Sequence, residues 1–358
     1  MKFDFVIGNP PYQERRETTK DMPIYDQFID AAYKIGNKVE LITPARFLFN
    51  AGATPKTWNQ KMLNDKHFKV LKYEQDSSNV FNNTDIKGGI AIHYRDNKKD
   101  FGAIETFLSF NELNSILNKL KTTENLIGLN TIMYPYSTYT LSEELWKDFP
   151  EMKKEIEYIV KNRNKLSKEE KNGKLSNLRI ITTNIFDLLP NLFLEEKLNN
   201  NEDYCCLLGR QNGERTYKYI LKKYISTADN YNKYKVIVPV ANGSGAIGEV
   251  LSTPLIGTPL IGYTQSFLGI GAFNSKLEAE NCMKYIKTKF CRCCLGILKI
   301  TQHNPPEKWI YVPLQDFTDN SDIDWSKSIK EIDQQLYKKY GLSEDEIKFI
   351  EEKVKEME

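Results

Sequence analysis

The residues best suited to chemistry stand near the amino terminus, in the segment Asn9-Pro10-Pro11-Tyr12. Asn9 has a side-chain carbonyl that accepts hydrogen bonds, and Pro10 has a backbone carbonyl with no N–H beside it. The two prolines stiffen the segment, and Tyr12 offers a flat ring for stacking. The combination predicts a site for a planar ligand with an exocyclic amino group. Two acceptors would hold its hydrogens, so that positioning alone supplies much of the rate of attack by its nitrogen.

An apolar run over residues 3–8 leads directly into this segment and predicts a buried strand. Ligands of open α/β sheets bind beyond the carboxyl ends of strands, which is where Asn9 to Tyr12 would stand. After this segment, apolar residues recur alternately with the spacing of helices and of strands. Helices are predicted over 24–35 and 58–65, and strands over 39–43, 68–73 and 89–94. This alternation predicts an α/β unit with a mostly parallel sheet.

The quoted segment resembles motif IV of the N6-adenine methyltransferases, which reads [D/N/S]-P-P-[Y/F/W], and matches it at all four positions. The resemblance implies methyl transfer from S-adenosyl-L-methionine to N6 of an adenine extruded from duplex DNA. It also implies the site residues. The Asn9 amide oxygen and the Pro10 carbonyl accept from N6, Tyr12 stacks on the base, and Pro11 completes the motif.

Later segments resemble the Eco57I-type restriction-modification family, namely IYDQFIDAAYKIGNKVELITPARFLF, NTDIKGGIAIHY and TKFCRCCLGILKITQHNPPEKWIYVPLQDFT. This resemblance implies an α/β fold class. A partial Rossmann-like methyltransferase sheet (residues 1–125) would precede a mixed α+β DNA target-recognition domain (126–315) and C-terminal helices (316–358). Phe47 and Phe81 are candidate second rings for the base pocket, with core packing as the alternative.

In that family the cofactor half comes before the motif, whereas eight residues precede Asn9 here. We therefore expect the S-adenosyl-L-methionine-binding half to be absent from this chain, and the edge of the partial sheet to expose apolar surface. A homodimer or a separate cofactor-binding or nuclease polypeptide would cover that edge. The glycines at 243, 245 and 248 fit G-x-G-x-x-G after a strand, but Pro254 follows where the fingerprint needs a helix.

That glycine loop is better interpreted as part of the recognition domain, where Asn242 and Ser244 would approach phosphate or a base edge. The candidate DNA contacts elsewhere are Arg210, Gln211, Lys289 and Arg292, accompanied by Asn212, Arg215, Lys218 and two nearby tyrosines. Residues 316–358 hold 7 Lys and 13 Asp or Glu, a charge of −6, so the rest of the chain carries +8. This balance fits a double-stranded DNA partner weakly, and ordinary solvated faces explain it too.

Further patterns bear on the carboxyl-terminal part and on the compartment. Helices are predicted over 275–298 and 329–340, a strand over 309–313, and a last helix with a Ser343–Glu346 capping box. The cysteine clusters at 205–206 and 291–294 suit neither disulfides nor zinc. Cys291, Cys293 and Cys294 are predicted to be packing thiols, and the compartment a reducing cytoplasm. No apolar run is long enough for a membrane span.

Three functions remain open. The first is a site-specific DNA adenine-N6 methyltransferase of a bacterial restriction-modification system. The second is a catalytically inactive DNA-binding remnant or specificity module. The third is an RNA or protein-glutamine methyltransferase, because such enzymes share NPPY. A nuclease core is not indicated, since Glu195-Glu196-Lys197 lacks a convincing partner, and no metal site is expected.

Overall fold

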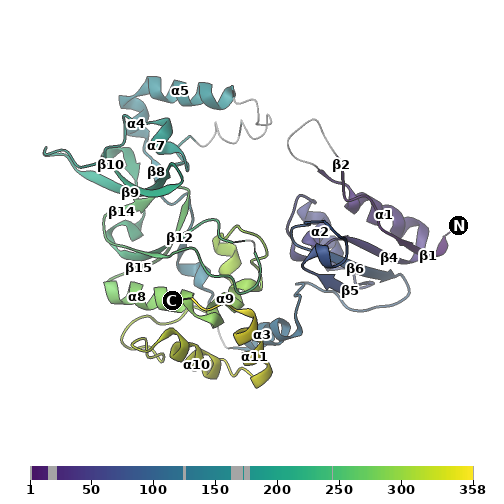
Figure 1. Cartoon of the computed structure of the whole chain (residues 1–358). Helices are drawn as coiled ribbons and strands as arrows, with labels where there is room; N and C mark the ends of the chain where they lie inside the picture. Colours follow the sequence, from purple (N-terminus) through teal and green to yellow (C-terminus); the bar gives the residue numbers. More distant parts are fainter. Residues whose placement is uncertain are drawn as a thin grey trace. The chain divides into compact units, whose positions relative to one another are not determined.

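The chain divides into two compact units, Met1–Asn114 and Ser115–Glu358. The computed structural model describes residues 2–14, 22–123, 126–162, 172, 178–243 and 245–357. Figure 1 shows the elements of both units, coloured along the sequence. The break between the units lies eleven residues before the predicted end of the catalytic portion at 125, and the division of the second unit by function stays a prediction.

The first unit is built on a four-stranded sheet of order β1-β4-β6-β5. Its elements are β1 (Phe3–Gly8), β2 (Gln13–Glu14), β3 (Met22–Pro23), α1 (Tyr25–Ile35), β4 (Gly36–Pro44), η1 (Arg46–Phe49), α2 (Lys56–Leu63), β5 (Phe68–Glu74), η2 (Ser77–Asn79) and β6 (Ile90–Asp96). Only β1 and β4, joined through α1, are parallel among the four. The prediction of a mostly parallel sheet is wrong because a loop rather than a helix joins β5 to β6, so these two strands run antiparallel.

One face of this sheet carries the core of the unit. The buried side chains of α1, α2, β4 and β6 meet there around Phe47, and His93 lies against the rings of Phe47 and Phe68 at 5.9 and 5.3 Å between ring centres. The imidazole is fully buried and its Nε2 lies 3.1 Å from Thr43 Oγ1. Burial lowers the pKa of His93 to about 3, so it is neutral in the folded protein.

The other face of the sheet is open at β1. Phe3, Phe5 and Ile7 point to it and expose 65%, 60% and 76% of their surface. The prediction that the sheet edge exposes apolar surface is therefore confirmed, whereas the prediction of a buried strand at residues 3–8 is wrong. An apolar run gives only the preference for burial, and a neighbouring element must supply it. Among the described residues, β1 pairs with β4 alone.

The second unit contains two larger sheets and several helices. Its strands are β7 (Met133–Tyr134), β8 (Thr140–Leu141), β9 (Tyr204–Gln211), β10 (Glu214–Leu221), β11 (Ile225–Ser226), β12 (Tyr234–Pro239), β13 (Leu255–Gly257), β14 (Ile261–Tyr263) and β15 (Phe267–Phe273). Three form the order β10-β9-β14 and four form β13-β12-β15-β7. Their inward faces share a core with Tyr139, Phe186 and Tyr263.

The remaining elements are α3 (Asn111–Thr122), which spans the break between the units, η3 (Leu129–Ile132), α4 (Glu143–Asp148), α5 (Pro150–Lys161), α7 (Ile185–Leu188), η4 (Lys222–Tyr224), η5 (Asp229–Asn232), α8 (Lys276–Lys287), α9 (Lys289–Gly296), η6 (Pro306–Trp309), α10 (Ile329–Lys339) and α11 (Glu344–Lys353). The single helix predicted over 275–298 is two helices, because extended Thr288 ends α8 and caps α9 with its side chain. The strand predicted over 309–313 is wrong. Trp309 ends a 3-10 turn and is fully buried, so its apolar pattern reflects packing.

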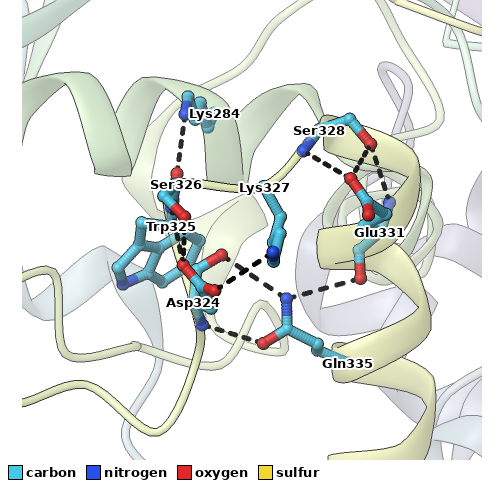
Figure 2. Close-up of polar contacts among 8 residues, drawn as sticks. All are labelled: Lys284, Asp324, Trp325, Ser326, Lys327, Ser328, Glu331 and Gln335. Atoms are coloured by element: carbon cyan, nitrogen blue, oxygen red, sulfur yellow. Dashed lines mark hydrogen bonds and ion pairs between the residues drawn. The ribbon is translucent and has the colours of Figure 1, made fainter.

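The helices at the carboxyl end are fixed by local polar contacts. Figure 2 shows the start of α10, where Ser328 and Glu331 form a reciprocal capping box and Gln335 accepts from the Asp324 backbone at 2.8 Å. Lys284 of α8 donates to the Trp325 carbonyl at 2.6 Å, which ties α8 to the turn before α10. The predicted capping box of Ser343 and Glu346 is confirmed at α11.

Two further observations concern the rest of the predictions. The thiols of Cys291, Cys293 and Cys294 are fully buried on α9, and burial raises their pKa, which confirms the prediction of packing thiols. Within the part of the chain that the structure describes, no helix combines the length and apolar character of a membrane span.

The buried His93 predicts a pH dependence of stability. The folded protein keeps it neutral, while the unfolded chain takes up a proton below its ordinary pKa of 6.5. The stabilisation is thus complete above pH 6.5 and is lost as the pH falls toward 3. Between pH 7 and 5 the first unit should lose about 2 kcal/mol, at about 1.4 kcal/mol per pKa unit. Denaturant-dependent hydrogen exchange of the β4 and β6 amides measures this loss. His93→Gln should flatten it, and an unchanged slope in that variant would contradict the assignment.

Candidate active site

A pocket of about 890 Å³ opens at the carboxyl ends of β1 and β4. Asn9, Pro10, Pro11 and Tyr12, which leave β1, form one wall. The other walls come from the start of α1, the end of β4 and two loops, through Gln13, Pro23, Tyr25, Pro44, Arg46, Gly52, Ala53, Phe81, Thr84, Asp85, Ile86 and Lys87. The four catalytic residues predicted from the motif therefore line one cavity, which is large enough for a purine nucleoside.

The motif is placed by the strand before it and the helix after it. Five residue pairs join β1 to β4 up to Gly8 and Leu41, so Asn9 emerges beside the end of β4. Beyond the motif, the backbone N–H of Ile24 donates to the Tyr12 carbonyl at 3.2 Å, just before α1 begins at Tyr25. The Asn-Pro-Pro-Tyr segment is thus anchored at both ends.

The Tyr12 ring is half-buried, and its hydroxyl oxygen is buried without a hydrogen bond of standard geometry to the described residues. Burial raises the pKa of Tyr12, while the nearby Asn9 side chain acts weakly in the opposite direction. The phenol therefore stays neutral at physiological pH. A neutral ring with a poorly bonded hydroxyl is suited to stacking rather than to acid–base chemistry.

Phe81 is placed in the pocket by a loop that one buried hydroxyl organises. Ser77 Oγ donates to the Thr84 carbonyl at 3.1 Å and accepts from the Ile86 N–H at 2.9 Å, which closes the loop around Phe81. Phe81 is half-buried and lines the pocket together with Tyr12. It is therefore a candidate second ring for a planar ligand.

The other candidate ring, Phe47, lies elsewhere. It is fully buried and packs against Trp58 and Tyr25, with ring centres 5.2 and 6.2 Å away. A ring in this position cannot stack on a ligand, so the expectation for Phe47 is corrected. In the 3-10 turn η1, Phe47 points into the core and its neighbour Arg46 points toward the pocket. The sequence alone does not determine which of these two neighbours faces the ligand.

The pocket residues that were not singled out from the sequence include Arg46, Thr84, Asp85 and Lys87. Asp85 and Lys87 form an exposed ion pair at 2.7 Å. Their only sequence signal is membership of the segments PARFLF and NTDIKGG, which carry the resemblance to the Eco57I-type family. Nothing in their spacing relative to Asn9 indicates a shared pocket, because the chain must first form the sheet.

Three of the predicted DNA contacts in the second unit are structural. Asn242 is buried and its side chain holds Val250 and Ser252 backbone groups. Arg292 is buried and donates to backbone carbonyls, including that of Gly248 at 3.2 Å. Lys289 is mostly buried and pairs with Glu351 at 2.5 Å. These expectations are corrected: the polar groups stabilise buried backbone and leave no surface for DNA. Ser244 lies outside the described residues.

The glycine loop near Asn242 also has a structural explanation. Gly243, Gly245 and Gly248 all have positive φ, and no helix opens at the last of them. A side chain at Gly248 would meet the backbone of Val354 at 2.5 Å. The loop is rich in glycine because another backbone passes close to it.

The hairpin of β9 and β10 carries the other predicted contacts. Arg210 and Arg215 face each other across it, and desolvation together with the charge of Arg210 lowers the pKa of Arg215. Neither forms an ion pair with a described acid. By contrast Gln211 donates to Asp187 at 3.1 Å, and Lys218 is buried against Glu195. Two like charges held together without a carboxylate favour an anionic partner.

Part of the first unit is similar to known proteins. Residues 1–81 match the Eco57I restriction-modification methylases. Over those residues the resemblance predicted from the sequence is confirmed. An "uncharacterized adenine-specific methylase" of Mycoplasma pneumoniae is 33% identical over 95 residues, which are 25% of this chain and 22% of that protein. The chain therefore spans less than a quarter of the length of this relative.

Solved structures give a weaker likeness. The type IIL restriction-modification enzyme MmeI in complex with DNA aligns with a TM-score of 0.41 and 9% identity, over 98% of this chain and 56% of that one. The type IIG restriction endonuclease BpuSI aligns with a TM-score of 0.33 and 11% identity, over 93% and 48%. At these scores the similarity supports no conclusion about this chain.

The Tyr12 hydroxyl, which has no hydrogen bond of standard geometry to the described residues, leads to a stability prediction. Removing it should leave the free energy of unfolding of the first unit within about 0.5 kcal/mol of the wild type or raise it slightly, because a buried hydroxyl with a poor hydrogen bond adds little stability. Urea unfolding of Tyr12→Phe measures this. Tyr12→Ala is the comparison variant and should lose ring packing. A loss above about 1 kcal/mol in Tyr12→Phe would mean that the hydroxyl has a partner in solution.

Proposed function

We propose that this chain carries the adenine-binding part of a DNA adenine-N6 methyltransferase of a restriction-modification system. The observation that supports this most is the single pocket that unites Asn9, Pro10 and Tyr12 with Phe81 at the carboxyl end of β1. Two acceptors and two rings are the groups that an extruded adenine needs. The match of residues 1–81 to a methylase family agrees with this reading.

In this proposal each group has one task. Asn9 Oδ1 and the Pro10 carbonyl accept the two hydrogens of N6, which directs the nitrogen lone pair away from the ring plane. Tyr12 and Phe81 hold the faces of the base, because base–aromatic stacking contributes about 1–3 kcal/mol per base. Pro11 keeps the loop rigid, so little conformational entropy is lost when the base enters.

The methyl donor of such enzymes is S-adenosyl-L-methionine, whose sulfonium supplies an electrophilic methyl group. The described pocket residues do not fit it. The carboxylate among the described pocket residues, Asp85, is exposed and pairs with Lys87, so these residues offer no buried acidic group to a ribose diol. The glycine loop of the second unit is packed against backbone. We derive no step through the donor, and we propose that its binding groups belong to a polypeptide element that packs on the exposed side chains of Phe3, Phe5 and Ile7.

DNA is the proposed partner of the second unit, through the Arg210–Arg215 pair and the exposed Tyr217 of the same hairpin. Arginines contact phosphates and guanine edges, and a neighbouring ring can pack on sugar or base. An inactive DNA-binding remnant would keep this hairpin as well, so binding of adenine in the pocket, and not the hairpin, distinguishes the methyltransferase from the remnant. An RNA or protein-glutamine methyltransferase is distinguished by which ligand the pocket prefers.

Adenine recognition can be tested without the donor. Ligand-observed NMR should detect dAMP binding to the full chain with a Kd on the order of millimolar, and the N6,N6-dimethyl analogue, which lacks both hydrogens, should bind at least tenfold more weakly. Asn9→Ala should reduce this discrimination, since one of the two acceptors is lost. Ser78→Ala, outside the pocket, is the control. Equal binding of the two ligands to the wild type, or preference for a glutamine amide, would contradict the proposal.

The donor assignment gives a separate prediction. Titration of S-adenosyl-L-methionine into the full chain alone should produce no calorimetric heat and no shift of Tm, because the described pocket residues offer no buried acidic group for the ribose. Micromolar binding by the chain alone would contradict the placement of the donor site on another element, while leaving the adenine pocket intact.

A further inference from the structure

Arg46 is a pocket residue whose side chain has no assigned task in adenine binding. It begins η1, directly after β4, and is half-buried on the wall of the pocket that Asn9 and Tyr12 also line. Its position follows from the parallel pairing of β1 with β4, because both strands end at the same edge of the sheet.

The stem of Arg46 is clamped between two glycines. Gly52 and Gly88 both have positive φ. A Cβ built on Gly88 would lie 2.7 Å from Arg46 Cγ, and one built on Gly52 would lie 3.1 Å from Arg46 Cβ. Its Nε donates to the Lys87 carbonyl. The side chain is therefore held in one direction before any ligand arrives, which lowers the entropy cost of using it.

The head of Arg46 carries an uncompensated charge. It makes no ion pair with any acid in the described part of the chain, and the acid on the same wall, Asp85, is paired with Lys87 at 2.7 Å. Only Nε has a hydrogen-bond partner among the described residues, so the two Nη groups remain for a ligand. A guanidinium that is fixed, half-buried and unpaired is suited to an anion with two acceptor oxygens.

We infer that Arg46 binds a phosphate of the nucleotide whose adenine occupies the pocket. The inference rests on the proposed function, because an extruded base always brings its own phosphodiester to the pocket rim. Arg46 would position the base through the backbone and would take no part in the chemistry. The alternative is that Arg46 only joins the loops of Gly52 and Gly88 and contacts no ligand.

The decisive experiment compares dAMP with deoxyadenosine, which differ only in the phosphate, by ligand-observed NMR on the full chain. The wild type should bind dAMP about fivefold more tightly, the effect of one partly exposed ion pair. Arg46→Met keeps the packed stem between the glycines and should bind both ligands equally. Arg46→Lys, which keeps the charge, should retain part of the preference. Lys61→Met removes an exposed lysine outside the pocket and should behave as the wild type.

A structural role predicts a different pattern. If Arg46 only joins two loops, Arg46→Met and Arg46→Lys should weaken both ligands together and lower the urea midpoint, with the dAMP preference unchanged. That result overturns the inference. Adenine discrimination against the dimethyl analogue, measured on the same samples, separates this failure from failure of the proposed function. If discrimination persists and the phosphate preference is absent in the wild type, only the Arg46 assignment is wrong.

Discussion

The parallel pairing of β1 with β4 is the constraint on which the candidate site depends. It brings two segments thirty-odd residues apart, Asn9–Tyr12 and Pro44–Arg46, to the same edge of one sheet. The helix α1 makes that pairing possible, because parallel neighbours need a crossover. Ile24, just before α1, also donates its N–H to the Tyr12 carbonyl at the end of the Asn-Pro-Pro-Tyr segment. A rigid loop without this frame would have acceptors and a ring, but no opposite wall.

The two faces of the sheet differ at β1, because one is covered and the other is open. The face toward α1 and α2 holds the core, while Phe3, Phe5 and Ile7 remain exposed on the other. Exposed apolar side chains on consecutive outward positions of an edge strand are costly unless another element covers them. The same strand ends at Asn9, so whatever covers it lies beside the pocket. The proposed donor-binding element and the exposed side chains thus share one explanation.

Polar residues in the second unit show how burial changes the meaning of a sequence pattern. Asn242, Arg292 and Lys289 have the chemistry of DNA contacts, yet each satisfies buried backbone or an internal acid. Buried donors and acceptors need partners, so many polar residues in a folded domain serve the fold. Arg210 and Arg215 differ because they repel each other and have no described acid beside them. The lack of a partner that neutralises their charge, rather than their residue type, distinguishes the two arginines from the three buried polar residues.

The sequence by itself determined the motif, its place after a strand, the resemblance of residues 1–81 and most helices of the first unit. These depend on local chemistry and on periods of two or 3.6 residues, which a chain displays before it folds. Tertiary structure alone decided that Phe81 and Arg46 face the pocket while Phe47 fills the core, and that three predicted contacts are buried. Those outcomes depend on which segments meet in space. Neighbouring residues in a turn point in opposite directions, and only the packed sheet selects which one meets the ligand.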